Sequence, residues 1–310
     1  MKTTLSLFAS FAALGALGLA AVPGAAGRDL QMIVVAEQTD QKTAPDLPKP
    51  DLPAFYVAFD AGYVEAGDPI ANEKPPASSA MAEALRNTLA AQGYQPAATE
   101  QPQLLFVYHW GLLNRDSHAI RNGNTIDPNL HARLALLTTA KQDSDIETQL
   151  LDQRLLGHTN REIGMPTFVN FHYRDIMELT HDDSYFFVLS AYDYASVSHR
   201  EARLLWQVKI STRSAGVAMA EALPTLLQGS AAYFGRNLDG FKNITAPLVA
   251  GIQVGSGTAG ALDFSPPSGV ARSLDQGYLR ELMKREHGEF SGARAGDLAA
   301  YAPRLSPPSL

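Results

Sequence analysis

Five stretches of the chain have the spacing of buried strands or helices. Residues 104–110 (LLFVYHW) are almost wholly apolar and aromatic, which predicts a central strand buried on both faces. Residues 185–192 and 204–210 are two β-rich runs separated by a polar stretch, and they predict an antiparallel hairpin with a long loop. In the second run apolar and polar residues alternate, so we expect one of its faces to be exposed to solvent.

Helical spacing occurs in two places. Apolar residues recur every four positions from Met81 to Leu89, after a serine cap at Ser78 or Ser79, and Gly93 stands where a left-handed C-terminal residue is expected. Residues 216–233 show similar spacing around a proline. Both segments are therefore predicted helices.

These elements, with a short strand at residues 55–59, predict an α+β fold. The expected core is a mixed, largely antiparallel sheet of about four strands with helices packed on one face. An insertion covers about residues 112–165, where the pattern is weaker: residues 130–137 are ambiguous, and residues 146–155 suggest a short helix. Another helix is expected over residues 168–179.

The N-terminus has the pattern of a bacterial-type signal peptide. Lys2 precedes an uncharged apolar run, and small residues follow, so we expect cleavage after Ala26, with Gly27 as the rival. A retained anchor is the other interpretation, but the apolar run is shorter than the ~20 residues that span a bilayer. We divide the chain into a signal peptide (1–26), a Pro-rich linker (27–51), an α+β domain (52–240) and a Gly/Pro-rich, partly disordered tail (241–310) with a helix at 275–287.

Composition narrows the compartment and the partners. The chain has no cysteine, so it has neither a disulfide nor the lipid-bearing cysteine of a lipoprotein, and we expect a periplasmic or secreted protein without a stable membrane span after cleavage. Its formal net charge is −7 and no basic run is present, which argues against nucleic acid as a partner.

A resemblance supports this interpretation. A helix ending in Gly93 and Tyr94 leads into a strand, a later strand carries Tyr192 and Asp193, and the next contains Leu205-Trp206. In this layout the chain resembles uncharacterised exported proteins of Gram-negative bacteria, similar to small envelope lipoprotein domains of unknown function. The resemblance implies the fold and the compartment, and it implies no activity.

No catalytic, cofactor or metal motif has its required context. Residues 255–260 spell GxGxxG, but two prolines follow where a phosphate-binding helix would have to begin. The eight histidines include no HExxH or other metal spacing, and no serine lies in a GxSxG or SxxK motif. We therefore predict no catalytic residues, no cofactor and no metal.

Two functions of different classes remain. The first is a non-catalytic protein- or ligand-binding module, whose partner is another envelope protein or a wall component bound through the sheet edge or the insertion. The alternative is a hydrolase whose site is assembled from the dispersed residues His109, His181 and Asp193. The alternative requires these three side chains to converge. For His109 alone a core position, and for Asp193 a capping role, are the simpler interpretations.

Overall fold

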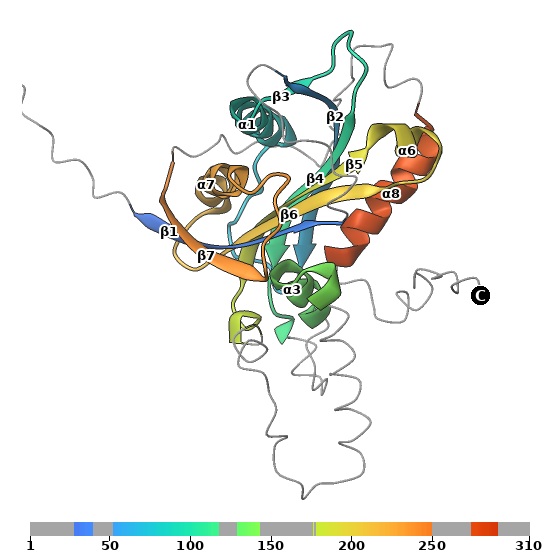
Figure 1. Ribbon diagram of the computed structural model, residues 1–310. Helices are drawn as coiled ribbons and strands as arrows, with labels where there is room; N and C mark the ends of the chain where they lie inside the picture. The colour runs from blue at the N-terminus through green and yellow to red at the C-terminus, as the bar shows by residue number, and fades with distance from the viewer. Residues whose placement is uncertain are drawn as a thin grey trace, which may run out of the picture.

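The apolar run at residues 104–110 forms an inner strand of a mixed β-sheet (Figure 1). The computed structural model describes residues 28–39, 52–117, 129–142, 176, 178–249 and 274–290. Strand β4 (Leu104–Leu113) is buried along its whole length, as predicted. It pairs antiparallel with β5 (Ser184–Asp193), and β5 pairs antiparallel with β6 (Leu204–Arg213). The predicted hairpin is thus confirmed.

The sheet is larger than predicted, with seven strands in the order β3-β2-β4-β5-β6-β1-β7. The remaining strands are β1 (Asp29–Gln38), β2 (Ala54–Ala66), β3 (Tyr94–Pro96) and β7 (Phe241–Pro247). The pairs β2–β3 and β2–β4 are parallel, and all others are antiparallel. The expectation of an α+β fold with a mixed sheet is confirmed, and the expectation of about four strands is wrong.

The two additional strands at one edge lie in segments for which we had predicted no strand. Strand β1 falls inside the range 27–51 that we had assigned to a linker, and it pairs with both β6 and β7. Strand β7 falls at the start of the predicted tail, 241–310. The sheet therefore extends beyond the domain limits of 52–240 on both sides. The backbone N–H and C=O groups of the apolar segment of β1 (residues 32–36, MIVVA) form hydrogen bonds to a neighbouring strand on each side.

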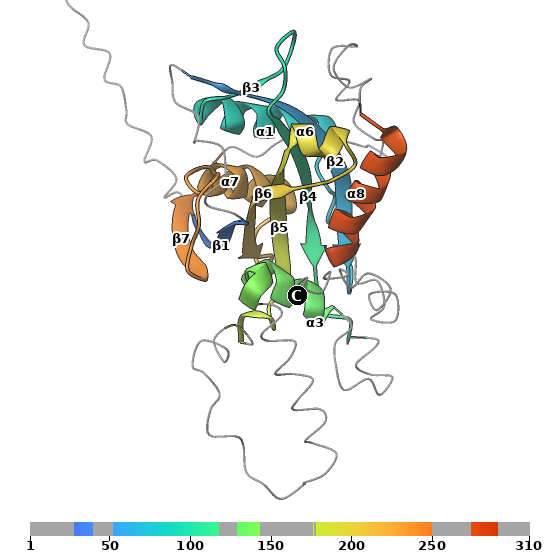
Figure 2. The ribbon, with the colours of Figure 1, turned by 45° about the vertical axis from the view of Figure 1, so that its right-hand side comes forward.

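Helices cover both faces of the sheet, which corrects the expected single covered face (Figure 2). On one face, α1 (Ser78–Ala91) and α7 (Met219–Ala231) pack against the main core, as their apolar spacing predicts. On the other face lie α3 (Leu130–Leu137) and α8 (Gln276–Phe290). Alternate residues of the central strands supply an apolar core to each side, which is why a second helical layer forms.

Part of the predicted insertion belongs to this framework. Strand β4 continues to Leu113, and α3 contacts β1, β6 and α8. The ambiguous segment 130–137 is thus a helix of the second layer. Residues 1–26 and 146–155, and all but a few residues of 168–179, lie outside the described residues.

Strand β6 is buried on both faces, so the half-exposed strand that we expected is a further correction. The amine of Lys209 donates to the carbonyls of Ala135 (2.7 Å) and Thr138 (3.1 Å) at the C-terminal end of α3. Carbonyls at a helix C-terminus attract a cation, so Lys209 fixes α3 on the sheet. The polar positions of β6 therefore face a helix and not solvent.

Helix α8 is attached by a second buried polar contact. The carboxylate of Glu286 accepts hydrogen bonds from the hydroxyls of Ser190 (2.7 Å) and Tyr192, and the side-chain amide of Gln207 donates to Ser190 (2.8 Å). Leu279 and Leu282 add apolar contact with the sheet. The carboxylate thereby sets where the helix lies on the sheet.

A bulge interrupts β2 next to the first turn of α1. The pairing of β2 with β4 shifts between Asp60 and Gly62, and Gly62 has a φ of 96°, a conformation that favours glycine. The amide of Gly62 donates to the carboxylate of Asp60 (2.7 Å), and the side chain of Ser78 also bonds it. Burial nevertheless raises the pKa of Asp60 to about 7.

Candidate functional site

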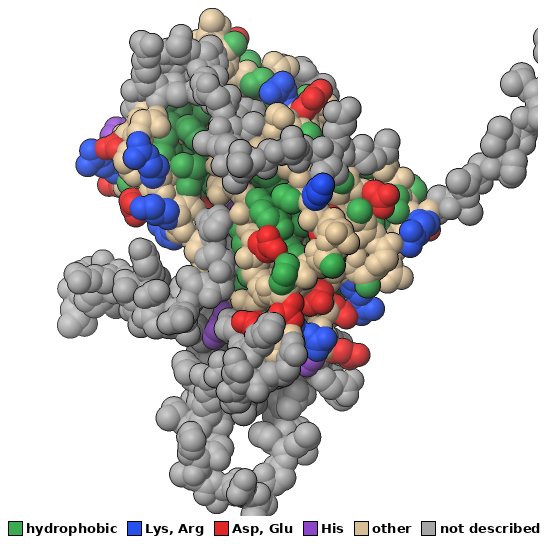
Figure 3. Space-filling view, turned by 180° about the vertical axis from the view of Figure 1, so that it is seen from behind, with side chains coloured by type: hydrophobic (Ala, Val, Ile, Leu, Met, Phe, Trp, Pro, Cys, Tyr) green, Lys and Arg blue, Asp and Glu red, His purple; other side chains and the backbone are tan. Residues whose placement is uncertain are grey.

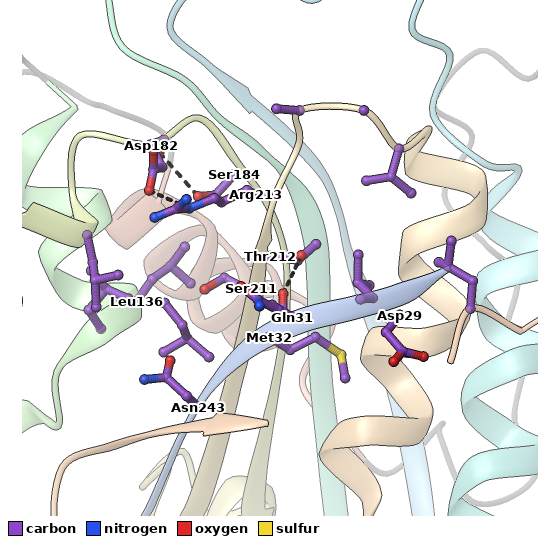
Figure 4. Close-up of a pocket in the computed structure, with 18 of the residues that line it drawn as sticks. Asp29, Gln31, Met32, Leu136, Asp182, Ser184, Ser211, Thr212, Arg213 and Asn243 are labelled. Carbon is purple, nitrogen blue, oxygen red and sulfur yellow. Dashed lines mark hydrogen bonds and ion pairs between the residues drawn. The ribbon is translucent and has the colours of Figure 1, made fainter. Parts of the chain in front are cut away.

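A cavity lies where β1 separates from β6. The two strands pair from Gln38 and Trp206 as far as Ile33 and Ser211, and beyond this point β1 pairs only with β7. Beyond the last backbone pair of β1 and β6, the side-chain hydroxyl of Thr212 donates to the carbonyl of Gln31 (2.7 Å). A cavity of about 290 Å³ occupies the widened end of the sheet (Figure 4).

The apolar part of the lining comes from both faces of the sheet, because the neighbouring residues Met32 and Ile33 point to opposite faces of β1. Helix α3 contributes Leu136 and Leu137, strand β1 contributes Met32 and Ile33, and Leu248 follows β7. The volume lies at the lower limit of small-molecule pockets, and at about 30 Å³ per water it corresponds to roughly ten non-hydrogen atoms.

The lining also carries three arginines, of which Arg133 belongs to α3, one turn before Leu136 and Leu137. At the mouth, Arg213 forms an ion pair with Asp182 (2.6 Å), and the side chain of Arg213 is 67% exposed (Figure 4). Arg28 donates to the carbonyl of Gly216 (2.8 Å). Arg133 is only 4% exposed and donates to the carbonyl of Thr180 (2.6 Å).

Hydroxyl and amide groups complete the polar part of the lining. Ser211 is 4% exposed and lines the cavity, and its hydroxyl makes no hydrogen bond within the described residues. Asn243 of β7 also lines the cavity and is exposed. These groups can donate to and accept from a ligand without first breaking a contact of the fold.

The lining of the cavity combines apolar, hydroxyl and charged side chains. Its lining includes neither histidine nor cysteine, and the carboxylate of Asp182, two residues before Ser184, is paired with Arg213. Ser184 donates to the carbonyl of Asp182 (3.2 Å), a contact that orders the loop. Shape and charge are therefore what this cavity offers a ligand.

The residues of the hydrolase alternative do not converge. Asp193 and Ser184 are at opposite ends of β5, which at about 3.3 Å per residue places them roughly 30 Å apart, and His181 precedes Ser184. Asp193 accepts a hydrogen bond from the amide of Ser196 (3.1 Å) at the start of α6 (Tyr194–Ser198), which is the predicted capping role. His109 is fully buried in β4 and lies edge-on to Phe186, as expected of a core residue.

The other motifs add no second site. The glycine-rich residues 255–260 lie outside the described residues. Within the described part of the chain, no group of three or more His, Asp and Glu side chains is placed to hold a metal ion. No helix among these residues is both long and apolar enough to cross a membrane.

Two surface features bear on partners. Strand β7 is the last strand of the sheet, and within the described ranges its outer edge pairs with no strand. The back view shows hydrophobic side chains gathered in the centre, with positive and negative side chains mixed on both sides (Figure 3). The described cations on this face thus form no continuous basic surface.

Sequence reasoning did not single out the cavity residues as a site. Asp182 lies between the predicted helix at 168–179 and the run at 185–192, and Arg213 lies beyond the run at 204–210, so neither was part of a predicted element. Arg133 could have been identified from the sequence, because it is the one arginine of the apolar segment LHARLALL. A charged side chain is rarely buried unless it has a partner. The arrangement itself depends on residues that are up to about 200 positions apart in the chain.

Comparison with known proteins gives no family for this chain. No family model matches, and no curated protein matches. A PDZ domain protein from Parabacteroides distasonis is similar with a TM-score of 0.36 and 8% identity; the match covers 71% of this chain and 39% of that one. A PelC dodecamer from Paraburkholderia phytofirmans is similar with a TM-score of 0.28 and 10% identity, over 66% of this chain and 99% of that one. Both TM-scores are too low to carry an argument about function.

Proposed function

We propose that this protein is a non-catalytic binding module of the bacterial cell envelope, periplasmic or secreted, and that the cavity at the end of β1 and β6 holds its ligand. The observation that carries the proposal is the mixed lining of the cavity, in which apolar side chains lie beside three arginines, one of them, Arg133, on the same helix as Leu136 and Leu137. Such pockets bind small molecules through apolar contact and orient them through a few polar groups.

Several features support binding over hydrolysis. The hydroxyl of Ser184 donates to the backbone carbonyl of Asp182 and not to its carboxylate, and the dispersed residues of the hydrolase alternative lie along a whole strand. The walls are held independently of any ligand, because Lys209 fixes α3 and Thr212 bonds to β1. A preformed site loses little conformational entropy on binding.

The test is capture of a small molecule. Ala215 is exposed and lines the cavity, so Ala215→Trp fills the mouth without altering the core. Ala71 is an exposed alanine in a turn that is not part of the cavity, and Ala71→Trp is the matched control. Native mass spectrometry after incubation with an envelope metabolite extract should show a bound small molecule on the wild type and on Ala71→Trp, and none on Ala215→Trp. Equal capture by all three proteins, or no capture by any, would refute the proposal.

Binding of an envelope protein is a second candidate function, favoured by the outer edge of β7. An extended segment of a partner can add to such an edge through backbone hydrogen bonds. Thr245→Pro places a residue without an amide hydrogen in β7 and should weaken this pairing. Crosslinking in envelope extracts should then yield a partner with the wild type and lose it with the variant, while circular dichroism shows an intact fold. If the folded variant still captures the partner, the outer edge of β7 is not the binding surface.

A further inference from the structure

We infer that the ligand of this cavity is a small organic anion with an apolar body, an inference that rests on the proposed function. The negative group would lie beside the arginines and Ser211, and the apolar body would lie against the leucines of α3. Three properties of the cavity support this ligand: the charge of its lining, the state of its polar groups and its size.

The lining has an excess of positive charge. It includes three arginines and two carboxylates, and one of these carboxylates, Asp182, is already paired with Arg213. Arg28 donates to a neutral carbonyl and forms no ion pair within the described residues. Asp29 lies apart from the Asp182–Arg213 pair (Figure 4). An anion in the cavity would therefore meet a net cationic charge.

A buried hydroxyl points to a polar head group in the same place. Ser211 is more than nine-tenths buried and lines the cavity, and its hydroxyl makes no hydrogen bond within the described residues. The hydroxyl oxygen is open to the cavity and not sealed in the core, so a ligand oxygen can hydrogen-bond to it there. Ser211 and Arg213 lie on the same side of β6, two residues apart, so both can contact one head group.

The remaining lining excludes a purely polar ion. Leu136, Leu137 and Ile33 give the lining an apolar surface, against which a hydrated inorganic ion would lose hydration without compensation. A body of roughly ten non-hydrogen atoms fills the volume. Phenylacetate has this size and carries one negative charge, and 2-phenylethanol and 2-phenylethylamine match it in shape with no charge and with a positive charge.

The experiment is isothermal titration of these three probes into the purified protein. We expect phenylacetate to bind at least about tenfold more tightly than the alcohol, since a charge-assisted hydrogen bond is worth this factor, and we expect the amine to bind most weakly. Arg213→Gln should weaken phenylacetate binding about tenfold and leave the alcohol unchanged. Asp182→Asn should strengthen phenylacetate binding several-fold, because the anion no longer competes with a carboxylate for Arg213.

The outcomes separate this inference from the proposed function. If phenylacetate and the alcohol bind with equal affinity, and Ala215→Trp abolishes both, the inference of an anionic ligand is wrong. The cavity then remains a binding site. Binding of phenylacetate that survives Ala215→Trp would place the anion elsewhere and overturn the inference. Absence of phenylacetate binding at roughly millimolar concentrations would overturn it as well, and the capture experiment then decides the proposed function by itself.

Discussion

The carboxyl of Asp60 should make the stability of the protein depend on pH, and Asp60→Asn tests this. Burial raises the pKa of Asp60 from 3.8 to about 7, so the folded protein binds this proton more tightly than the unfolded chain does. The resulting stabilisation is fully present below pH 3.8 and is lost as the pH rises toward 7. Asparagine keeps a carbonyl for the amide of Gly62 and cannot ionise.

The magnitude follows from the two pKa values. The difference between 3.8 and about 7 corresponds to about 4 kcal/mol, of which about 1.5 kcal/mol is already lost at pH 5. Between about pH 5 and pH 8 the wild type should therefore lose about 2–3 kcal/mol relative to Asp60→Asn. Because the side chain is partly exposed, solvent screening reduces the expected value to about 2 kcal/mol.

Urea denaturation at pH 5 and pH 8 measures this difference. The two tryptophans, Trp110 and Trp206, are buried in the core and report unfolding by fluorescence. The pH dependence of every other group cancels when the wild type is compared with the variant. Glu83→Gln removes an exposed carboxylate from the neighbouring helix α1 and is the matched control for the loss of one carboxylate. If Asp60→Asn also gives the same difference at pH 5 and pH 8, the reasoning is wrong.

Three further predictions concern the packing of the sheet. Lys209→Met should destabilise the protein by about 1–3 kcal/mol, because the carbonyls at the end of α3 lose their donor, and amide hydrogen exchange in α3 should accelerate. Glu286→Ala should lower the free energy of unfolding by about 1–3 kcal/mol and speed amide hydrogen exchange in α8. Glu286→Gln should lower it less, because glutamine still accepts a hydrogen bond. Equal losses would show that the hydrogen bonds of Glu286 do not stabilise the protein. Gly111→Ala should destabilise strongly, since an added Cβ would lie 1.9 Å from the carbonyl oxygen of Val64, while Gly288→Ala in α8 meets no atom within 4 Å and should stabilise by up to about 1 kcal/mol. Urea midpoints check both glycine variants, and similar midpoints would contradict the packing argument.

The central elements were predictable because their side chains repeat the period of their structure. Strand β4 is apolar at nearly every position, and α1 repeats an apolar residue every fourth position. Strand β1 was missed because a Pro-rich segment follows it closely, so its apolar run was assigned to the linker. Strand β7 gives no such pattern, since most of its side chains are exposed at the edge of the sheet.

The second layer was missed for a different reason. Gln207 and Lys209 alternate with apolar residues, which is also the pattern of a strand that faces water. In the structure their polar groups bond to Ser190 and to the end of α3. Sequence periodicity cannot distinguish a polar side chain in solvent from one that is buried with a partner. The cavity could not be predicted either, because it depends on the point at which β1 and β6 cease to pair.

The position of β1 between β6 and β7 has a consequence for the order of folding. Ile33 pairs with Ser211 and with Asn243, so the first strand of the sheet finds its neighbours only after most of the chain has been synthesised. Contacts over such sequence distances close slowly, because the entropy of a long loop must be overcome first. A nascent chain that stops before residue 241 would expose an unpaired edge of β1. Late closure of the sheet would keep the polypeptide extended during synthesis, which is the state that the proposed export through a membrane pore requires.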